Sequence, residues 1–164
     1  MMPADREAKV AAKKFRQQHN LGNQPLGDLA ELIQRTTGHD VAVLDVPSSD
    51  IGLTMYDPAR EKYIIGVPCT PYPMRQRSIL AQELAYIILW DLSSDLSQSH
   101  KEFFADAFAQ HLLVPHTGLE EILGEKDQTI SLQLLSRVVR HFLVPPQMAA
   151  NALRDAWVYT AKDS

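Results

Sequence analysis

Apolar and polar positions along the chain repeat with a helical period, then with a strand period, and then with a helical period again. Apolar side chains three or four positions apart predict helices in the first and last parts of the chain. Alternating, valine-rich runs between them predict short strands. The first part of the chain is therefore expected to hold two helices, residues 4–19 and 28–38, and three strands, residues 40–46, 51–57 and 62–67.

The second half of the chain is expected to be helical throughout. The last two strands are joined through "PAREK", a connection of hairpin length, which favours an antiparallel pair. Helical periodicity then predicts five helices, residues 74–90, 101–115, 117–124, 131–144 and 146–158. Two helices, three strands and then more helices indicate an α+β fold with a small antiparallel sheet.

Composition places the chain among globular proteins of the reduced interior of a cell. Its 164 residues are 45% hydrophobic and 22% charged, enough for one domain with a sizeable core. Cys69 is the single cysteine, so an internal disulfide and a thiolate metal cluster are excluded. The net charge of −4 argues against broad binding of a phosphate backbone. The charged N-terminal stretch does not resemble a signal peptide, and the apolar runs are too short for a membrane span. We therefore expect a cytoplasmic protein that does not enter a membrane.

An unusual polar trio lies in the stretch "RQRSILAQELAYIILW", residues 75–90, which is otherwise apolar nearly all round. Gln82 and Tyr86 are one helical turn apart on one face, and Glu83 adjoins them. Their spacing is that of H-E-x-x-H, in which two histidines hold zinc and the glutamate activates the metal-bound water. A third ligand would come from another helix, and "EFFAD" suits that role. Glu102 is its candidate ligand, and Asp106 is a candidate to support the ligands one turn further on.

These two segments resemble the ImmA/IrrE family of zinc metallopeptidases, a gluzincin-like group. Members of that family typically have R-x-R-F-x-x-A-H-E-x-x-H and then E-x-x-A-N/D-x-F-A-x-x-L-L-x-P. The positions that match are Arg75, Arg77, Ala81, Glu83, Glu102, Ala105, Asp106, Phe108, Ala109, Leu112, Leu113 and Pro115. The resemblance covers roughly residues 5–155. It implies a zincin-like peptidase domain over residues 1–124, with a C-terminal helical segment over residues 125–164 packed on it. It also implies a role in the bacterial cytoplasm, where intact members are regulatory proteases that cleave helix-turn-helix repressors.

Both zinc histidines of that family are replaced here, by Gln82 and Tyr86. An amide oxygen is a weak neutral ligand, and a tyrosine must first lose a proton with a pKa of about 10. Only Glu102 remains of the three protein ligands, and one carboxylate does not hold zinc. We therefore expect no metal or other cofactor, with Glu83 left as a remnant of the general base. Gln82 and Tyr86 are expected to fill the space of the metal and to hydrogen-bond Glu83 and Glu102.

Three functions remain open from the sequence. The first is a non-catalytic regulatory module that binds a protein partner, for which the resemblance implies a helix-turn-helix repressor. The second is an active zinc peptidase with an unusual ligand set, such as Glu83, Glu102 and a histidine. The third is a DNA-binding regulator that acts through its last two helices, which resemble a helix-turn-helix. Its candidate contacts to DNA or a partner are Arg137, Arg140, Gln147, Asn151 and Arg154.

Overall fold

Helices and strands follow one another in the order that the apolar periodicity predicts. The computed structural model describes residues 3–45, 51–92, 95–124 and 130–162. In order, the elements are α1 Pro3–Gln18, α2 Leu29–Thr37, β1 Asp40–Leu44, β2 Leu53–Asp57, β3 Lys62–Pro68, α3 Pro73–Leu92, α4 Gln98–Leu113, α5 His116–Leu123, α6 Leu132–Phe142 and α7 Pro146–Lys162. The α+β class is confirmed. Val46, at the end of the first expected strand, lies outside the described residues.

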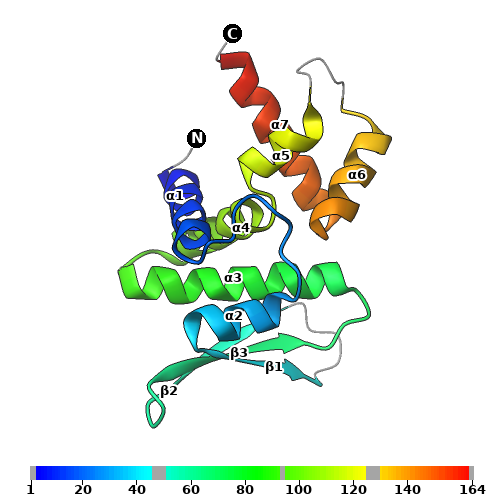
Figure 1. Ribbon diagram of the computed structural model, residues 1–164. Helices are drawn as coiled ribbons and strands as arrows, with labels where there is room; N and C mark the ends of the chain where they lie inside the picture. The colour runs from blue at the N-terminus through cyan, green and yellow to red at the C-terminus, as the bar shows by residue number, and fades with distance from the viewer. Residues whose placement is uncertain (1–2, 46–50, 93–94, 125–129, 163–164) are drawn as a thin grey trace.

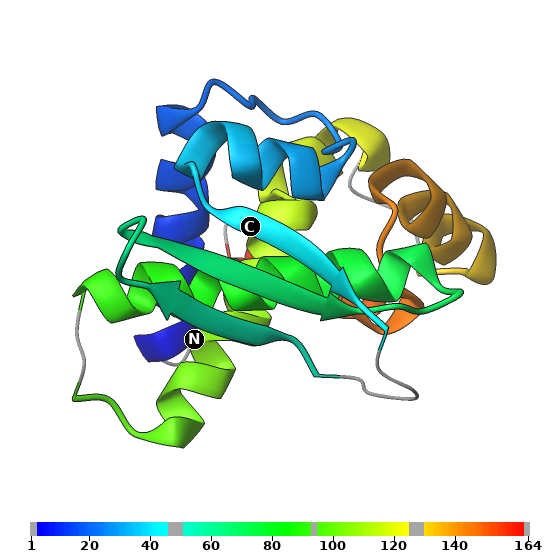
Figure 2. The same cartoon turned by 90° about the horizontal axis from the view of Figure 1, so that it is seen from below.

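The three strands form a mixed sheet in the order β1-β3-β2 (Figure 2). β2 and β3 pair antiparallel, with Tyr56 opposite Tyr63, as the short connection predicts. β1 pairs parallel to β3, with Val41 opposite Ile65, so the expectation of a wholly antiparallel sheet was wrong for this pair. Alternation of apolar residues determines which face of a strand is buried, but it does not determine the direction of a neighbouring strand.

α3 is the central element of the molecule. Figure 1 shows it between the sheet on one side and α1 and α4 on the other. It packs against β3, β2, α2 and α4, and α1 lies on α4. A helix covered on opposite sides must be apolar nearly all round, which explains the composition of residues 75–90. Polar side chains on such a helix are therefore held close to other parts of the protein.

Side-chain caps begin three of the helices. The oxygens of Asp28, Ser97 and Ser131 accept hydrogen bonds from the backbone N–H three residues later, at the starts of α2, α4 and α6. Gly38 ends α2 in the left-handed conformation at a φ of 76°, which glycine adopts without a steric penalty. These local signals account for helix ends that the apolar pattern alone leaves imprecise.

The C-terminal helices share one hydrophobic core with the rest of the chain. Side chains of α6 and α7, among them Val138, Phe142 and Leu153, belong to the same buried cluster as Leu84 and Phe108. The division at residue 124 stays a prediction. Among the described helices, none is long and apolar enough to cross a membrane.

Candidate functional site

The structure brings the polar trio of α3 and the acidic pair of α4 into one cleft. Its volume is about 700 Å³. Gln82, Glu83, Tyr86, Glu102 and Asp106 all line it. Side chains that sequence reasoning missed complete the wall: Ile51, Gly52, Thr54, Leu89, Trp90, Gln98 and Lys101. Thr54 belongs to β2 and Gln98 to the first turn of α4, and neither falls in a motif.

Gln82 is bound to Asp106 across the interface between α3 and α4. Its amide Nε2 donates to Oδ1 of Asp106 at 3.0 Å. The expected partners of Gln82 were Glu83 and Glu102, and this expectation was wrong. Instead, the Glu83 carboxylate accepts a hydrogen bond from Thr54, and the Glu102 carboxylate accepts one from Gln98. The carboxylate of Asp106 thus contacts the amide that the sequence predicts in the first histidine position.

Glu83 is the most deeply buried acid of the cleft, with 8% of the residue exposed. Its Oε2 accepts a hydrogen bond from the Thr54 hydroxyl at 2.6 Å. Burial raises the pKa of Glu83, and the bond from Thr54 acts against that rise. Gly52 lies so close that a Cβ atom on it would be 2.6 Å from Cγ of Glu83 and 2.8 Å from Cγ2 of Ile79. The backbone just before β2 therefore packs closely against the Glu83 side chain.

Negative charge gathers around the Tyr86 hydroxyl. Burial raises the pKa of Tyr86, and the carboxylates of Glu83, Glu102 and Asp106 raise it further. Burial and the charge of Glu102 likewise raise the pKa of Asp106. Glu102 accepts a hydrogen bond from Nε2 of Gln98 at 3.3 Å. Tyr86 is consequently a neutral phenol at neutral pH, because ionisation would add a further negative charge to an acidic cleft.

The side chains that the resemblance predicts at the three zinc-ligand positions do not fit zinc. The amide nitrogen of Gln82 donates to Asp106 and its oxygen is a weak neutral ligand, Tyr86 holds its proton, and Glu102 offers a single carboxylate. Zinc sites in proteins use imidazole, thiolate or carboxylate donors, usually at least three of them. Within the described residues, no group of three or more His, Cys, Asp or Glu side chains could hold a metal ion.

The histidines nearest in sequence are engaged elsewhere. Nε2 of His100 lies 3.3 Å from Glu7, and Nε2 of His116 lies 2.8 Å from Glu120. His111 lies beside Asp5 on α1. In the part of the chain that the structure describes, no histidine lines the cleft beside Glu83 and Glu102.

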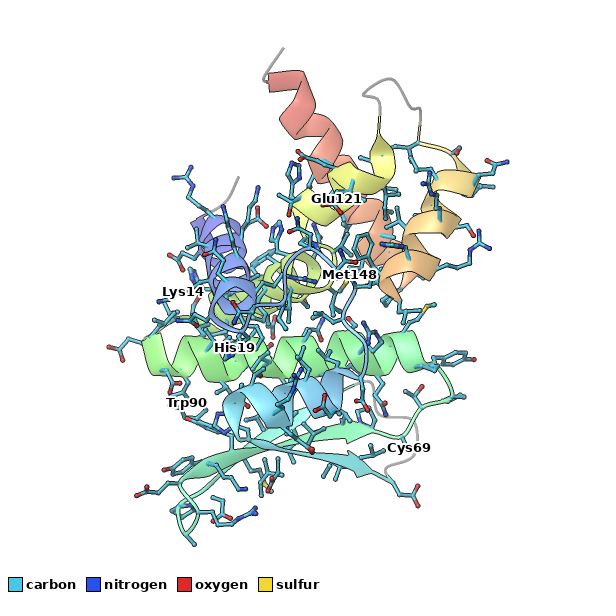
Figure 3. The ribbon with its side chains drawn as sticks, in the orientation of Figure 1. Lys14, His19, Cys69, Trp90, Glu121 and Met148 are labelled. Carbon is cyan, nitrogen blue, oxygen red and sulfur yellow. The ribbon has the colours of Figure 1, made fainter. Side chains whose placement is uncertain are left out.

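A second groove, of about 750 Å³, adjoins the cleft and shares Gln82 and Asp106 with it. Three of the five predicted contact residues line this groove: Gln147, Asn151 and Arg154, all on α7. Met148 of α7, labelled in Figure 3, also lines it. The other two predicted contacts, Arg137 and Arg140, are exposed on α6 and are not in its lining. The groove therefore brings together three of the five predicted contacts.

Trp90 extends the cleft with a large aromatic side chain. Trp90, labelled in Figure 3, is 64% exposed. Its ring centroid lies 6.4 Å from that of Tyr63. Of the three phenylalanines of α4, Phe104 and Phe108 are buried, but Phe103 is 55% exposed and lines the second groove. Exposed aromatic side chains beside a cleft are typical of binding surfaces.

Comparison with known proteins assigns the chain to a family. The family model for the IrrE N-terminal-like domain matches residues 34–154, so the chain belongs to this family of metallopeptidases. The resemblance to ImmA/IrrE proteins is thereby confirmed. The fold is similar to that of a Mycobacterium tuberculosis transcriptional regulator, with a TM-score of 0.57 at 20% identity. The match covers 91% of this chain and 50% of the regulator, so this chain spans half of the regulator's length. No curated protein matches the chain.

Proposed function

We propose that this chain is a non-catalytic regulatory module of its family, which binds a protein partner through the peptidase-like cleft without cutting it. The observation that carries the proposal is the hydrogen bond from Gln82 to Asp106. It engages the side chain at the first ligand position, where an intact member has a zinc-binding histidine. Glu83 is retained, but the chemistry for which it would serve as base needs a metal-bound water.

The proposed partner is a helix-turn-helix repressor, and the proposed place of action is the bacterial cytoplasm. Family membership supports the class of partner. The size and lining of the site support binding of a protein segment, because the cleft and the second groove meet at Gln82 and Asp106 and form a long concave surface. Exposed Trp90 and Phe103 provide aromatic contact area at opposite parts of that surface.

Metal analysis of protein purified without a chelator or a metal-affinity tag tests the loss of zinc. We expect no stoichiometric zinc in the wild-type chain. The double variant Gln82→His/Tyr86→His should bind zinc, because it places two imidazoles one turn apart facing Glu102. The matched control adds Glu102→Gln to the double variant and should bind zinc much more weakly. Stoichiometric zinc in the wild type would overturn the proposal and favour an active peptidase.

Calorimetric titration with a helix-turn-helix repressor encoded beside this chain's own gene tests the partner. Binding should leave the repressor uncut, and Trp90→Ala should weaken it by about tenfold or more, as for a buried aromatic contact. The control Arg137→Ala/Arg140→Ala lies outside the cleft and should bind as the wild type does. A different result would be that the wild type binds duplex DNA with a steep salt dependence and that the Arg137→Ala/Arg140→Ala variant loses that binding. This result would favour the DNA-binding function.

A further inference from the structure

A third hollow lies apart from the cleft and the groove and shares no lining residue with either. Its volume is about 680 Å³, which is within the range of small-molecule sites. The residues that line it come from α1, the α1–α2 connection, the end of α4 and the start of α5: Lys9, Lys13, Arg16, Gln17, Asn20, Gly22, Asn23, His111, Pro115, His116 and Thr117. We call it the basic pocket.

Three permanent cations line one side of the basic pocket. Lys9, Lys13 and Arg16 are four and three positions apart on α1, so they share one face of that helix. Like charges at this spacing repel one another. His111 and His116 line the pocket as well, and no carboxylate is among the described residues that line it. This arrangement concentrates positive charge in a chain whose net charge is −4.

Arg16 carries a buried charge that no carboxylate of the described residues offsets. It is only 5% exposed, and its guanidinium donates to the backbone carbonyls of Leu112, Gly22 and Gln24 at 2.6 to 3.0 Å. Burial lowers the pKa of Arg16 to about 10, and no neighbouring acid raises it. Carbonyl oxygens satisfy its N–H groups, but they carry no full negative charge.

The acids nearest the basic pocket face other side chains. Oδ1 of Asp5 lies 3.5 Å from Nε2 of His111, and Oε1 of Glu120 lies 2.8 Å from Nε2 of His116. The Glu121 carboxylate accepts from Asn23 at 3.4 Å. These contacts hold the polar side chains around the hollow.

The start of α5 adds a smaller contribution of the same sign. α5 begins at His116 after Pro115, which provides no side-chain cap, and both residues line the basic pocket. The N-terminal end of a helix carries partial positive charge on its first N–H groups. Helix charge, lysines and arginine therefore all favour a negatively charged occupant at the same place.

From this concentration of charge we infer that the basic pocket binds a small phosphate-type anion. Ammonium groups on flexible stems suit phosphate oxygens, and the buried Arg16 charge lowers the energy of any anion in the pocket without having to contact it. A phosphate group carries up to two negative charges and several acceptor oxygens, which matches a site with several donors and no acid in its lining. The inference is independent of the function proposed for the cleft.

Titration of the ¹⁵N-labelled chain with inorganic pyrophosphate, followed by NMR, tests this inference. Saturable amide shifts should gather at residues 9–23 and 111–118, with a Kd of about 1 mM or tighter. Lys9→Gln/Lys13→Gln should weaken binding by about tenfold or more, because each charged hydrogen bond contributes strongly. Lys14→Gln is the matched control, since Lys14 is an exposed lysine of α1 outside the lining (Figure 3). It should bind pyrophosphate within about twofold of the wild type.

Adenosine monophosphate and an oligoglutamate peptide distinguish the sources of negative charge. Adenosine monophosphate shifting the same amides would mark a nucleotide site, and pyrophosphate alone would mark a free-phosphate site. The inference is overturned if pyrophosphate does not saturate these amides, or if Lys14→Gln weakens binding as much as the double variant does. It is also overturned if oligoglutamate binds there more tightly than pyrophosphate. Thermal unfolding of each variant checks that the fold is intact.

Discussion

Glu83 is a buried carboxyl group, and its ionisation should make the protein less stable. Its pKa is raised above the ordinary value of 4.5, so the folded chain keeps this proton at a pH where the unfolded chain has lost it. The resulting stabilisation is fully present below pH 4.5 and is lost as the pH rises through the raised pKa. Glu83→Gln removes this dependence, because a neutral amide can still accept the hydrogen bond from Thr54.

Urea unfolding of the wild type and of Glu83→Gln, measured from acid to neutral pH, checks this prediction. Relative to the variant, the wild type should lose stability as the pH rises from 4.5. Asp106 also has a raised pKa, but it is present in both proteins, so its contribution cancels in the difference. Parallel stability profiles would contradict the assignment of a buried, proton-holding carboxyl to Glu83.

Gly52 allows β2 and the segment before it to approach Glu83. A Cβ atom there would lie 2.6 Å from Cγ of Glu83 and 2.8 Å from Cγ2 of Ile79, closer than van der Waals contact. Gly52→Ala should therefore lower the free energy of unfolding by about 1–3 kcal/mol, as overpacking does. Chemical denaturation measures the loss. Gly27→Ala is the control, since a Cβ at Gly27 has no neighbour within 4 Å. Equal stability of Gly52→Ala and the wild type would show that the strand moves away from Glu83 without cost.

At the level of residues, the sequence could predict which side chains meet but not how they pair. Helical spacing and the family resemblance together place Gln82, Glu83 and Tyr86 opposite Glu102 and Asp106. The choice of Asp106 as the partner of Gln82 depends on the distance between α3 and α4 and on side-chain rotamers. The role of Thr54 depends on the position of an edge strand that is distant in sequence. Neither of these can be obtained from spacing along a single helix.

Arg77 of α3 connects three elements through backbone carbonyls. It donates to Leu143 between α6 and α7 at 3.0 Å, and to Leu26 and Gly27 before α2. These hydrogen-bond partners are backbone carbonyls of segments that are distant in sequence. Burial lowers the pKa of Arg77, against the influence of Asp28. Arg77 thus positions the C-terminal helices on the central helix.

Removal of Arg77 should weaken that connection measurably. Arg77→Ala leaves the carbonyls of Leu26 and Leu143 without their donor, and we expect a loss of about 2 kcal/mol in the free energy of unfolding. Urea denaturation gives the value. Arg35→Ala is the control, because Arg35 makes an exposed pair with Glu31 at 3.4 Å and should change stability by less than about 0.5 kcal/mol. Similar losses in the two variants would mean that Arg77 contributes no more than a surface charge.

At the level of elements, local signals predicted the helices better than they predicted the sheet. Caps such as Asp28 and Ser131 are encoded within a few residues of the helix that they begin. β1 pairs with the edge of β3 that its hairpin partner β2 leaves open, and it runs parallel to β3 there. Strand direction therefore follows from the path of the whole chain, which the alternation in "DVAVLDV" does not contain.

At the level of the whole molecule, the buried core crosses the expected boundary at residue 124. Leu134, Val138, Phe142 and Leu153 lie beyond that boundary and belong to the same cluster as Leu119 before it. α7 packs against α5 and α4 as well as against α6. Burial of each large apolar side chain contributes about 1.5–3 kcal/mol. Several of them together approach the total stability of a domain, about 5–15 kcal/mol.

A chain that ends at Gly124 should therefore fail to unfold cooperatively, whereas the 164-residue chain should unfold in one transition. Removal of α6 and α7 exposes apolar side chains of α4 and α5 and also removes the carbonyl of Leu143 that Arg77 contacts. Circular dichroism and fluorescence during urea denaturation measure cooperativity, and their transitions should coincide in the intact chain. Addition of a separate peptide of residues 125–164 to the shortened chain is the control, and it should restore a cooperative transition if the shared core is responsible. A shortened chain as stable as the intact one would instead make residue 124 a true domain boundary, with the peptidase-like cleft supported by residues 1–124 alone.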